Sequence, residues 1–196
     1  INYLISQNKE DIDITVLTIY DKSEDSTMKK NVLVFGLISG LVVSTLMAIS
    51  MVSMYNNPDA GHGGGSMIIG YLSMLVAFSL IFVAVKNYRD KQNGGVISFG
   101  KAFKIGLLIA LIGSTMYVIM WALLYNFYMP DFMDRYCAQM IENAKATSSP
   151  AKIQELTEQM NTQKEMYKNP LFFVLFTYFE IFPVGLIVSL ITALIL

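Results

Sequence analysis

The residue best placed to do chemistry is Glu180, an acid inside an otherwise uncharged apolar stretch. It lies ten positions after Pro170, which corresponds to about 15 Å along a helix and so to the middle of a bilayer. An ionisable group at that depth is costly and marks a functional site by default. No Lys or Arg accompanies it in any apolar stretch, so the neutral acid is the expected form.

Other polar residues are expected at a similar depth. Pro183, three positions after Glu180, removes a backbone hydrogen bond and favours a kink. Ser44, Ser114 and Thr115 supply hydroxyls from two other apolar stretches. These five residues form the candidate polar site, and two interpretations stay open. The carboxyl either donates a hydrogen bond that locks the helices together, or it binds a cation or carries a proton.

Other chemistries have weaker support. His62 is the sole histidine and Cys137 the sole cysteine, which excludes a multi-histidine metal site, a histidine-based triad and an intramolecular disulfide. Met47, Met51 and Met54 share one helix face; thioethers suit Cu(I), but methionine is also common packing material. We therefore expect no catalytic residue, no metal and no cofactor.

Four apolar elements must position the candidate site. The chain is 54% hydrophobic and only 15% charged, whereas soluble domains are about 25% charged. Four stretches lack charged residues, with Glu180 as the one exception. They cover about residues 32–54, 66–85, 105–129 and 171–196. Each stretch reaches the ~20 residues that a membrane-spanning helix needs. The sequence predicts an all-α polytopic protein with four transmembrane helices, and it argues against a soluble enzyme or a nucleic-acid binder.

Lysine and arginine predict the orientation. The linker between the second and third spans contains Lys86, Arg89, Lys91, Lys101 and Lys104, whereas residues 55–65 contain neither residue type. Basic segments stay in the cytoplasm. Both termini are therefore expected in the cytoplasm, and the segment 130–169 is expected outside. The chain ends without a basic residue after the fourth span, so we expect a short basic tail to be missing.

The segment 130–169 is predicted to form an external helical hairpin. One helix runs from Asp131 to about Thr147, and Ser149 caps a second helix with Pro150 at its first position. Such a pair could bind a partner or fold on itself as a cap. On the other side, Gly94 and Gly95 predict a turn, and Ser98 is expected to cap the helix that enters the third span.

Small residues recur every four positions in three spans, which places them on single helix faces where backbones approach closely. They serve either packing within the chain or a homo-oligomer interface. These residues are Gly36 and Gly40, Gly106 and Ala110, and Gly185 and Ser189.

Residues 1–27 differ from the rest, with two basic and six acidic side chains. Met28 is followed by two lysines and the first apolar run, which is typical of the start of a membrane protein. We therefore expect residues 1–27 to be an acidic disordered leader, which either precedes the natural start or forms a cytoplasmic tail, and residues 28–196 to form the membrane domain. The alternative is a short strand over residues 12–19, which alternate in polarity.

Three segments carry a family resemblance: Gly95-Val96-Ile97-Ser98-Phe99-Gly100-Lys101-Ala102-Phe103-Lys104, Tyr167-Lys168-Asn169-Pro170 and Glu180-Ile181-Phe182-Pro183-Val184-Gly185-Leu186-Ile187. Through them, residues 29–196 resemble a bacterial membrane-protein family known as domain of unknown function 4199. The resemblance implies a four-span protein of the inner membrane and supports a start at Met28. It implies no activity and no catalytic residue.

The sequence therefore predicts an inner-membrane protein of unknown activity, which is a non-enzymatic membrane component or a partner-binding component. The alternative is a proton- or cation-coupled transporter component that uses Glu180. The expected partners are the lipid bilayer and either a second copy or an unidentified membrane protein, and not nucleic acid.

Overall fold

The protein is built from helices throughout the part of the chain that can be described. The computed structural model describes the backbone of residues 2–57, 64–145 and 147–196, and side chains from residue 25 onward except 58–67 and 146. The helices are α1 (Asn2–Asn56), α2 (Gly64–Gln92), α3 (Phe99–Leu123), α4 (Phe132–Lys145), α5 (Pro150–Tyr167) and α6 (Pro170–Ile195), with a π-helical turn η2 (Leu124–Tyr128) after α3. The predicted all-α class is confirmed.

Four helices are long and apolar enough to cross a membrane. Within the described residues these segments are Asp25–Asn56, Ile68–Gln92, Phe99–Tyr128 and Pro170–Ile195. They overlap all four predicted spans and extend beyond each of them at one end or both, because helical hydrogen bonding continues into the polar ends of each run. The pair α4 and α5 lies between the third and fourth spans, as the sequence predicts.

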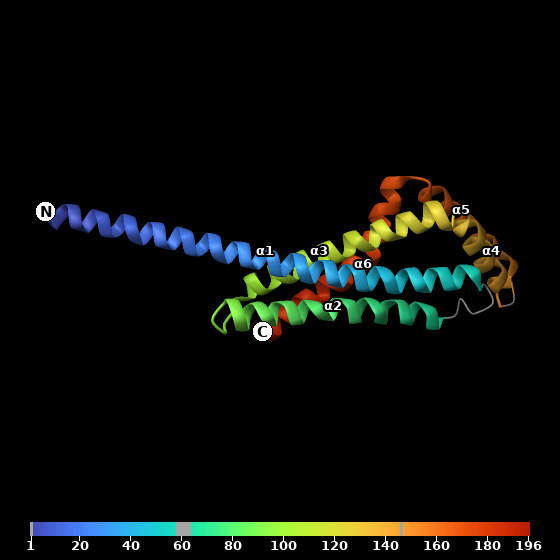
Figure 1. Ribbon diagram of the computed structural model, residues 1–196. Helices are drawn as coiled ribbons and strands as arrows, with labels where there is room; N and C mark the ends of the chain where they lie inside the picture. The colour runs from blue at the N-terminus through green and yellow to red at the C-terminus, as the bar shows by residue number, and fades with distance from the viewer. Residues whose placement is uncertain (1, 58–63, 146) are drawn as a thin grey trace.

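The four spans form one bundle. Helix α3 packs most extensively against α1 and α6, and α2 packs against the same two helices and also contacts α3. Figure 1 shows the turn between α2 and α3 at the same end of the bundle as the C-terminus, with α4 and α5 at the opposite end. The basic linker and the hairpin are therefore separated by the length of the bundle.

Helix α1 extends well beyond the other helices. It begins at Asn2 and projects alone from the bundle in Figure 1, where the sequence predicts a disordered leader or a short strand. Adding residues to an existing helix costs little compared with starting one, so the backbone of this segment continues the first span. The buried part of α1 starts near Met28, Asn31 and Val32.

The core follows the contacts between spans. Phe78 and Ile81 of α2, Ile105 and Ile109 of α3 and Ile181 of α6 are fully buried. Many large apolar side chains on the outside of the spans are exposed, among them Leu41, Ile69, Val76, Ile119 and Leu194. This outward apolar surface is the one that a helix bundle presents to lipid.

The turn between α2 and α3 is glycine-dependent. Gly94 and Gly95 have φ angles of 65° and 85°, a region that disfavours other residues, so the predicted turn is confirmed. Ser98 precedes α3 as expected, but its side chain makes no capping hydrogen bond. Asn93 closes the turn instead: its Nδ2 donates to the carbonyl of Val96, and its Oδ1 accepts from Lys101 Nζ at 3.2 Å.

Candidate functional site

Helix α6 places Glu180 on the outside of the bundle. Asn169 caps this helix by accepting from the backbone N–H of Leu171 at 3.0 Å, and α6 continues through Pro183 to Ile195. Thr177 and Ile181 are 1% and 0% exposed and face the other spans. Glu180 itself is exposed, because neighbouring residues on a helix point about 100° apart. No described residue forms a hydrogen bond or ion pair with its carboxyl.

The two serines of the candidate polar site lie elsewhere. Ser44 of α1 and Ser114 of α3 are 2% and 0% exposed inside the bundle, and neither hydroxyl has a partner among the described groups. The structure therefore places these serines in the core and Glu180 on the surface. Depth along the spans is readable from the sequence, but the direction in which each residue points depends on tertiary packing.

Thr115 joins α3 to α6 through Tyr178, two positions before Glu180 in the sequence. Its Oγ1 lies 2.7 Å from the hydroxyl of Tyr178 and also donates to the carbonyl of Leu111 at 2.7 Å. With the threonine proton used in this way, Tyr178 is the donor in the contact between the helices. Sequence reasoning missed Tyr178, because only the fold brings it beside a residue 63 positions away.

Other buried hydroxyls have structural partners. Ser39, also missed, donates from α1 to the carbonyl of Ala77 in α2 at 2.9 Å. Thr177 and Ser189 donate to carbonyls one turn earlier in α6, at 2.8 and 2.7 Å. These bonds satisfy hydroxyl groups for which the lipid hydrocarbon offers no hydrogen-bond partner.

The predicted small residues lie between helices of the same chain. A Cβ atom on Gly185 would be 2.7 Å from that of Ala110, and one on Gly106 would be 2.9 Å from that of Ser189. Gly36 and Gly40 approach Ile112 and Met116 of α3 in the same way. The small residues thus allow α3 to approach both α1 and α6 closely. This supports the interpretation that they serve packing within the chain.

A polar cluster joins the end of α1 to the start of α4. The hydroxyl of Tyr55 donates to Asp131 at 2.5 Å, and Arg135 Nε lies 2.6 Å from the other oxygen of Asp131. The guanidinium of Arg135 also lies 4.4 Å from the centre of the Tyr55 ring. The hydrogen bond from Tyr55, followed by that from Arg135, lowers the pKa of Asp131. The spacing of Asp131 and Arg135 is visible in the sequence, but the contact with Tyr55 is not.

Aromatic side chains fill the same end of the bundle. Trp121 meets Phe132 edge-on at 5.0 Å between ring centres, and Tyr125 and Tyr167 lie 5.1 and 5.7 Å from Phe173. Such pairs stabilise beyond their buried area. The π-helical turn η2, which the sequence does not predict, closes with a bond from Met129 N to the carbonyl of Leu124 at 2.8 Å. These contacts fix the hairpin on the bundle.

The hairpin itself is held by a few specific contacts. Met133 and Cys137 of α4 are buried, and the thiol of Cys137 lies 3.7 Å from the carbonyl of Met160 in α5. Burial raises the pKa of this thiol. Lys164 of α5 forms an ion pair with Asp134 of α4. The predicted hairpin is therefore a packed pair of helices.

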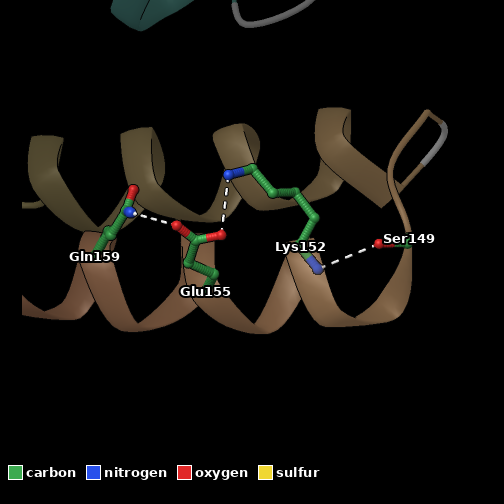
Figure 2. Close-up of polar contacts among 4 residues, drawn as sticks. All are labelled: Ser149, Lys152, Glu155 and Gln159. Atoms are coloured by element: carbon green, nitrogen blue, oxygen red, sulfur yellow. Dashed lines mark hydrogen bonds and ion pairs between the residues drawn. The ribbon is translucent and has the colours of Figure 1, made fainter.

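Helix α5 presents a polar outer surface. Figure 2 shows its start, where Ser149 accepts from Lys152 N at 3.4 Å, confirming the predicted cap. Glu155 then receives Lys152 Nζ at 2.9 Å and Gln159 Nε2 at 3.2 Å. The described part of the chain has no group of three His, Cys, Asp or Glu side chains that could hold a metal ion. A shallow groove follows at the end of α5, lined by Asn161, Thr162, Glu165, Met166 and Asn169.

Comparison with known proteins connects this fold to one family. The family described as "Protein of unknown function (DUF4199)" matches residues 34–196. The match begins within the first span, in α1, and includes the other three spans and the whole hairpin. No curated protein and no solved structure matches the chain. Because the match covers most of the sequence, the chain belongs to the DUF4199 family of proteins of unknown function.

Proposed function

We propose that the protein is a non-enzymatic component of the bacterial inner membrane, with both termini in the cytoplasm, that binds a protein partner through α5. The observation that carries this proposal is the exposure of α5. None of its 18 residues is fully buried, although the helix is held in place on α4. A fixed helix with an open polar surface is suited to recognition.

The chemistry of α5 indicates the kind of partner. Lysine, glutamate and glutamine side chains alternate along its exposed side, with Lys152, Glu155 and Gln159 already arranged by mutual contacts. Side chains that are ordered before binding lose less entropy when a partner docks. Met166, 45% exposed beside the groove, adds an apolar contact point. We therefore expect a water-exposed protein surface with complementary charge.

Photo-crosslinking in native membranes tests this proposal. A photoreactive amino acid at Gln159 should yield one adduct of discrete mass, whereas the same group at Val76, on the lipid-facing side of α2, should not. Reversing charge with Glu155→Lys and Glu158→Lys should weaken the adduct. Maleimide protection of Cys137 would show that the variant hairpin is still packed. Equal adducts at both positions, or none at Gln159, would rule out α5 as the docking surface.

A second candidate function is proton- or cation-coupled transport. The observation in its favour is Glu180, the single acidic or basic residue within the four predicted spans. Glu180 lies on the outside of the bundle, whereas the hydroxyls of Ser44 and Ser114 are buried inside it. These groups do not line one pathway for a proton or cation, which favours the first proposal. Flux in proteoliposomes, compared with Glu180→Gln, distinguishes the two. A flux that the substitution abolishes would establish transport.

A further inference from the structure

Helix α6 is the span that the chain itself covers least. Only 22% of its apolar window is buried inside the bundle, against 33–39% for the other three spans. Among the described helices, α6 makes its main contacts with α3, α2 and α5. A large share of α6 is thus open to lipid or to another protein.

The open side of α6 contains one continuous line of residues. Their positions differ alternately by four and three, the spacing that keeps a row of side chains facing one partner helix. Five of the six are exposed and Pro183 is half-buried. We call this row the α6 seam: Phe176, Glu180, Pro183, Ile187, Leu190 and Leu194.

Lipid alone does not satisfy the seam, because the carboxyl of Glu180 needs a hydrogen-bond partner. Its carboxyl is exposed near the middle of the span and has no partner within the described residues. The hydroxyl of Tyr178, two positions before Glu180 on α6, is already bonded to that of Thr115. Hydrocarbon offers no hydrogen bonds, so a carboxyl in this place requires a polar group from outside the chain.

A second copy supplies such a group at the right depth. A neutral carboxyl has one donor and one acceptor and is therefore complementary to itself. Two copies inserted in the same direction and related by a two-fold axis along the membrane normal place identical residues opposite each other. The four predicted spans contain no Lys, Arg or His that could serve as a different partner.

We propose that two copies of the chain pair through the α6 seam, with the two Glu180 carboxyls hydrogen-bonded to each other in the membrane. Each acid donates its O–H to the carbonyl oxygen of the other, so no charge is left in the hydrocarbon. The apolar residues of the seam pack along the two α6 helices on either side of this pair. The proposal concerns assembly within the membrane and is independent of the partner proposed for α5.

Cysteine crosslinking in membranes tests the pairing. In a Cys137→Ala background, Ile187→Cys should form a disulfide-linked dimer under mild oxidation. The matched control is Val76→Cys, because Val76 is 63% exposed on α2 and Ile187 is 55% exposed on α6. Equal yields at the two positions would overturn the proposal, as would an Ile187→Cys adduct to a protein of different mass.

The role of the carboxyl is tested in the same assay. Glu180→Leu in the Ile187→Cys chain should lower the dimer yield roughly tenfold, as expected for the loss of a pair of interhelical hydrogen bonds in a bilayer. Glu180→Gln should retain most of the dimer, because an amide also pairs with itself. An undiminished yield with leucine, in a chain whose thermal unfolding is unchanged, would overturn the assignment to Glu180. If the leucine variant fails to fold, the comparison of Ile187→Cys with Val76→Cys still decides whether the copies pair.

Discussion

At the scale of single residues, two carboxylates have opposite surroundings. Asp131 receives hydrogen bonds from Tyr55 and Arg135, whereas Glu180 has no partner in the described chain. Glu180 could be singled out from the sequence, because it is the one charge in an apolar run. The role of Asp131 could not, because its first partner is 76 positions away and only the fold brings them together.

The lowered pKa of Asp131 predicts a pH-dependent contribution to stability. The ionised form is favoured in the folded state, so the contribution is present above the ordinary aspartate pKa of about 3.9 and is lost as pH falls through the lower folded value. Asp131→Asn should therefore lower the melting temperature at pH 7, and the difference from wild type should shrink as the pH falls below the ordinary aspartate pKa. Fluorescence of Trp121, the sole tryptophan, reports the transition.

A matched control separates this effect from general loss of charge. Glu142 pairs with Lys145 on the exposed side of α4, and such surface pairs contribute little. Glu142→Gln should leave the melting temperature nearly unchanged at pH 7 and at acid pH. A difference between Asp131→Asn and wild type that persists at acid pH would contradict the assignment to the carboxylate.

At the scale of elements, hydropathy and most local signals gave good predictions because they act locally, although the side chain of Ser98 does not make the predicted capping bond. The four spans, the turn at Gly94 and the start of α5 after Ser149 are all found. The direction of Glu180 could not be predicted, since it depends on which face of α6 meets α3. The π-helical turn at Leu124–Tyr128 was also missed, because it depends on how the aromatic end of α3 packs against α4 and α6.

The contact between α3 and α6 predicts the effect of a single methyl group. Gly185→Ala should lower the free energy of unfolding by about 1–3 kcal/mol, the usual cost of overpacking, because the new Cβ would lie 2.7 Å from that of Ala110. Gly70→Ala is the matched control, as no atom lies within 4 Å of its added Cβ. That variant should be neutral or stabilised by up to about 1 kcal/mol through helix propensity.

Unfolding in mixed micelles measures both glycine variants under the same conditions. The two substitutions add the same methyl group to membrane helices, so any intrinsic effect of alanine is common to them. Equal effects would mean that α3 and α6 are not in close contact at Gly185. A larger loss for Gly70→Ala would point to an external surface packed against α2.

At the scale of the whole molecule, the two ends of the bundle differ in charge. One end has the basic linker between α2 and α3, and the other has the hairpin, whose acidic and basic residues are nearly balanced. Figure 1 places the C-terminus beside the basic end. The distribution of lysines in the sequence predicts this placement but does not show it. The basic end gathers Lys29, Lys30, Lys86, Arg89, Lys91, Lys101 and Lys104. This separation makes a direct prediction about topology.

The positive-inside rule predicts that the basic end faces the cytoplasm. Reporter fusions after Lys91 and after Pro150 should report opposite sides, with a fluorescent protein active at the first and alkaline phosphatase active at the second. Two identical signals would contradict the four-span arrangement, and two reversed signals would place the hairpin in the cytoplasm. Neutralising Lys86, Arg89 and Lys91 with glutamine should produce a mixture of orientations, because the rule attributes the orientation to basic residues of this kind. The side on which the hairpin lies is also the side on which a partner of α5 must be sought. The reporter fusions therefore determine where to look for that partner.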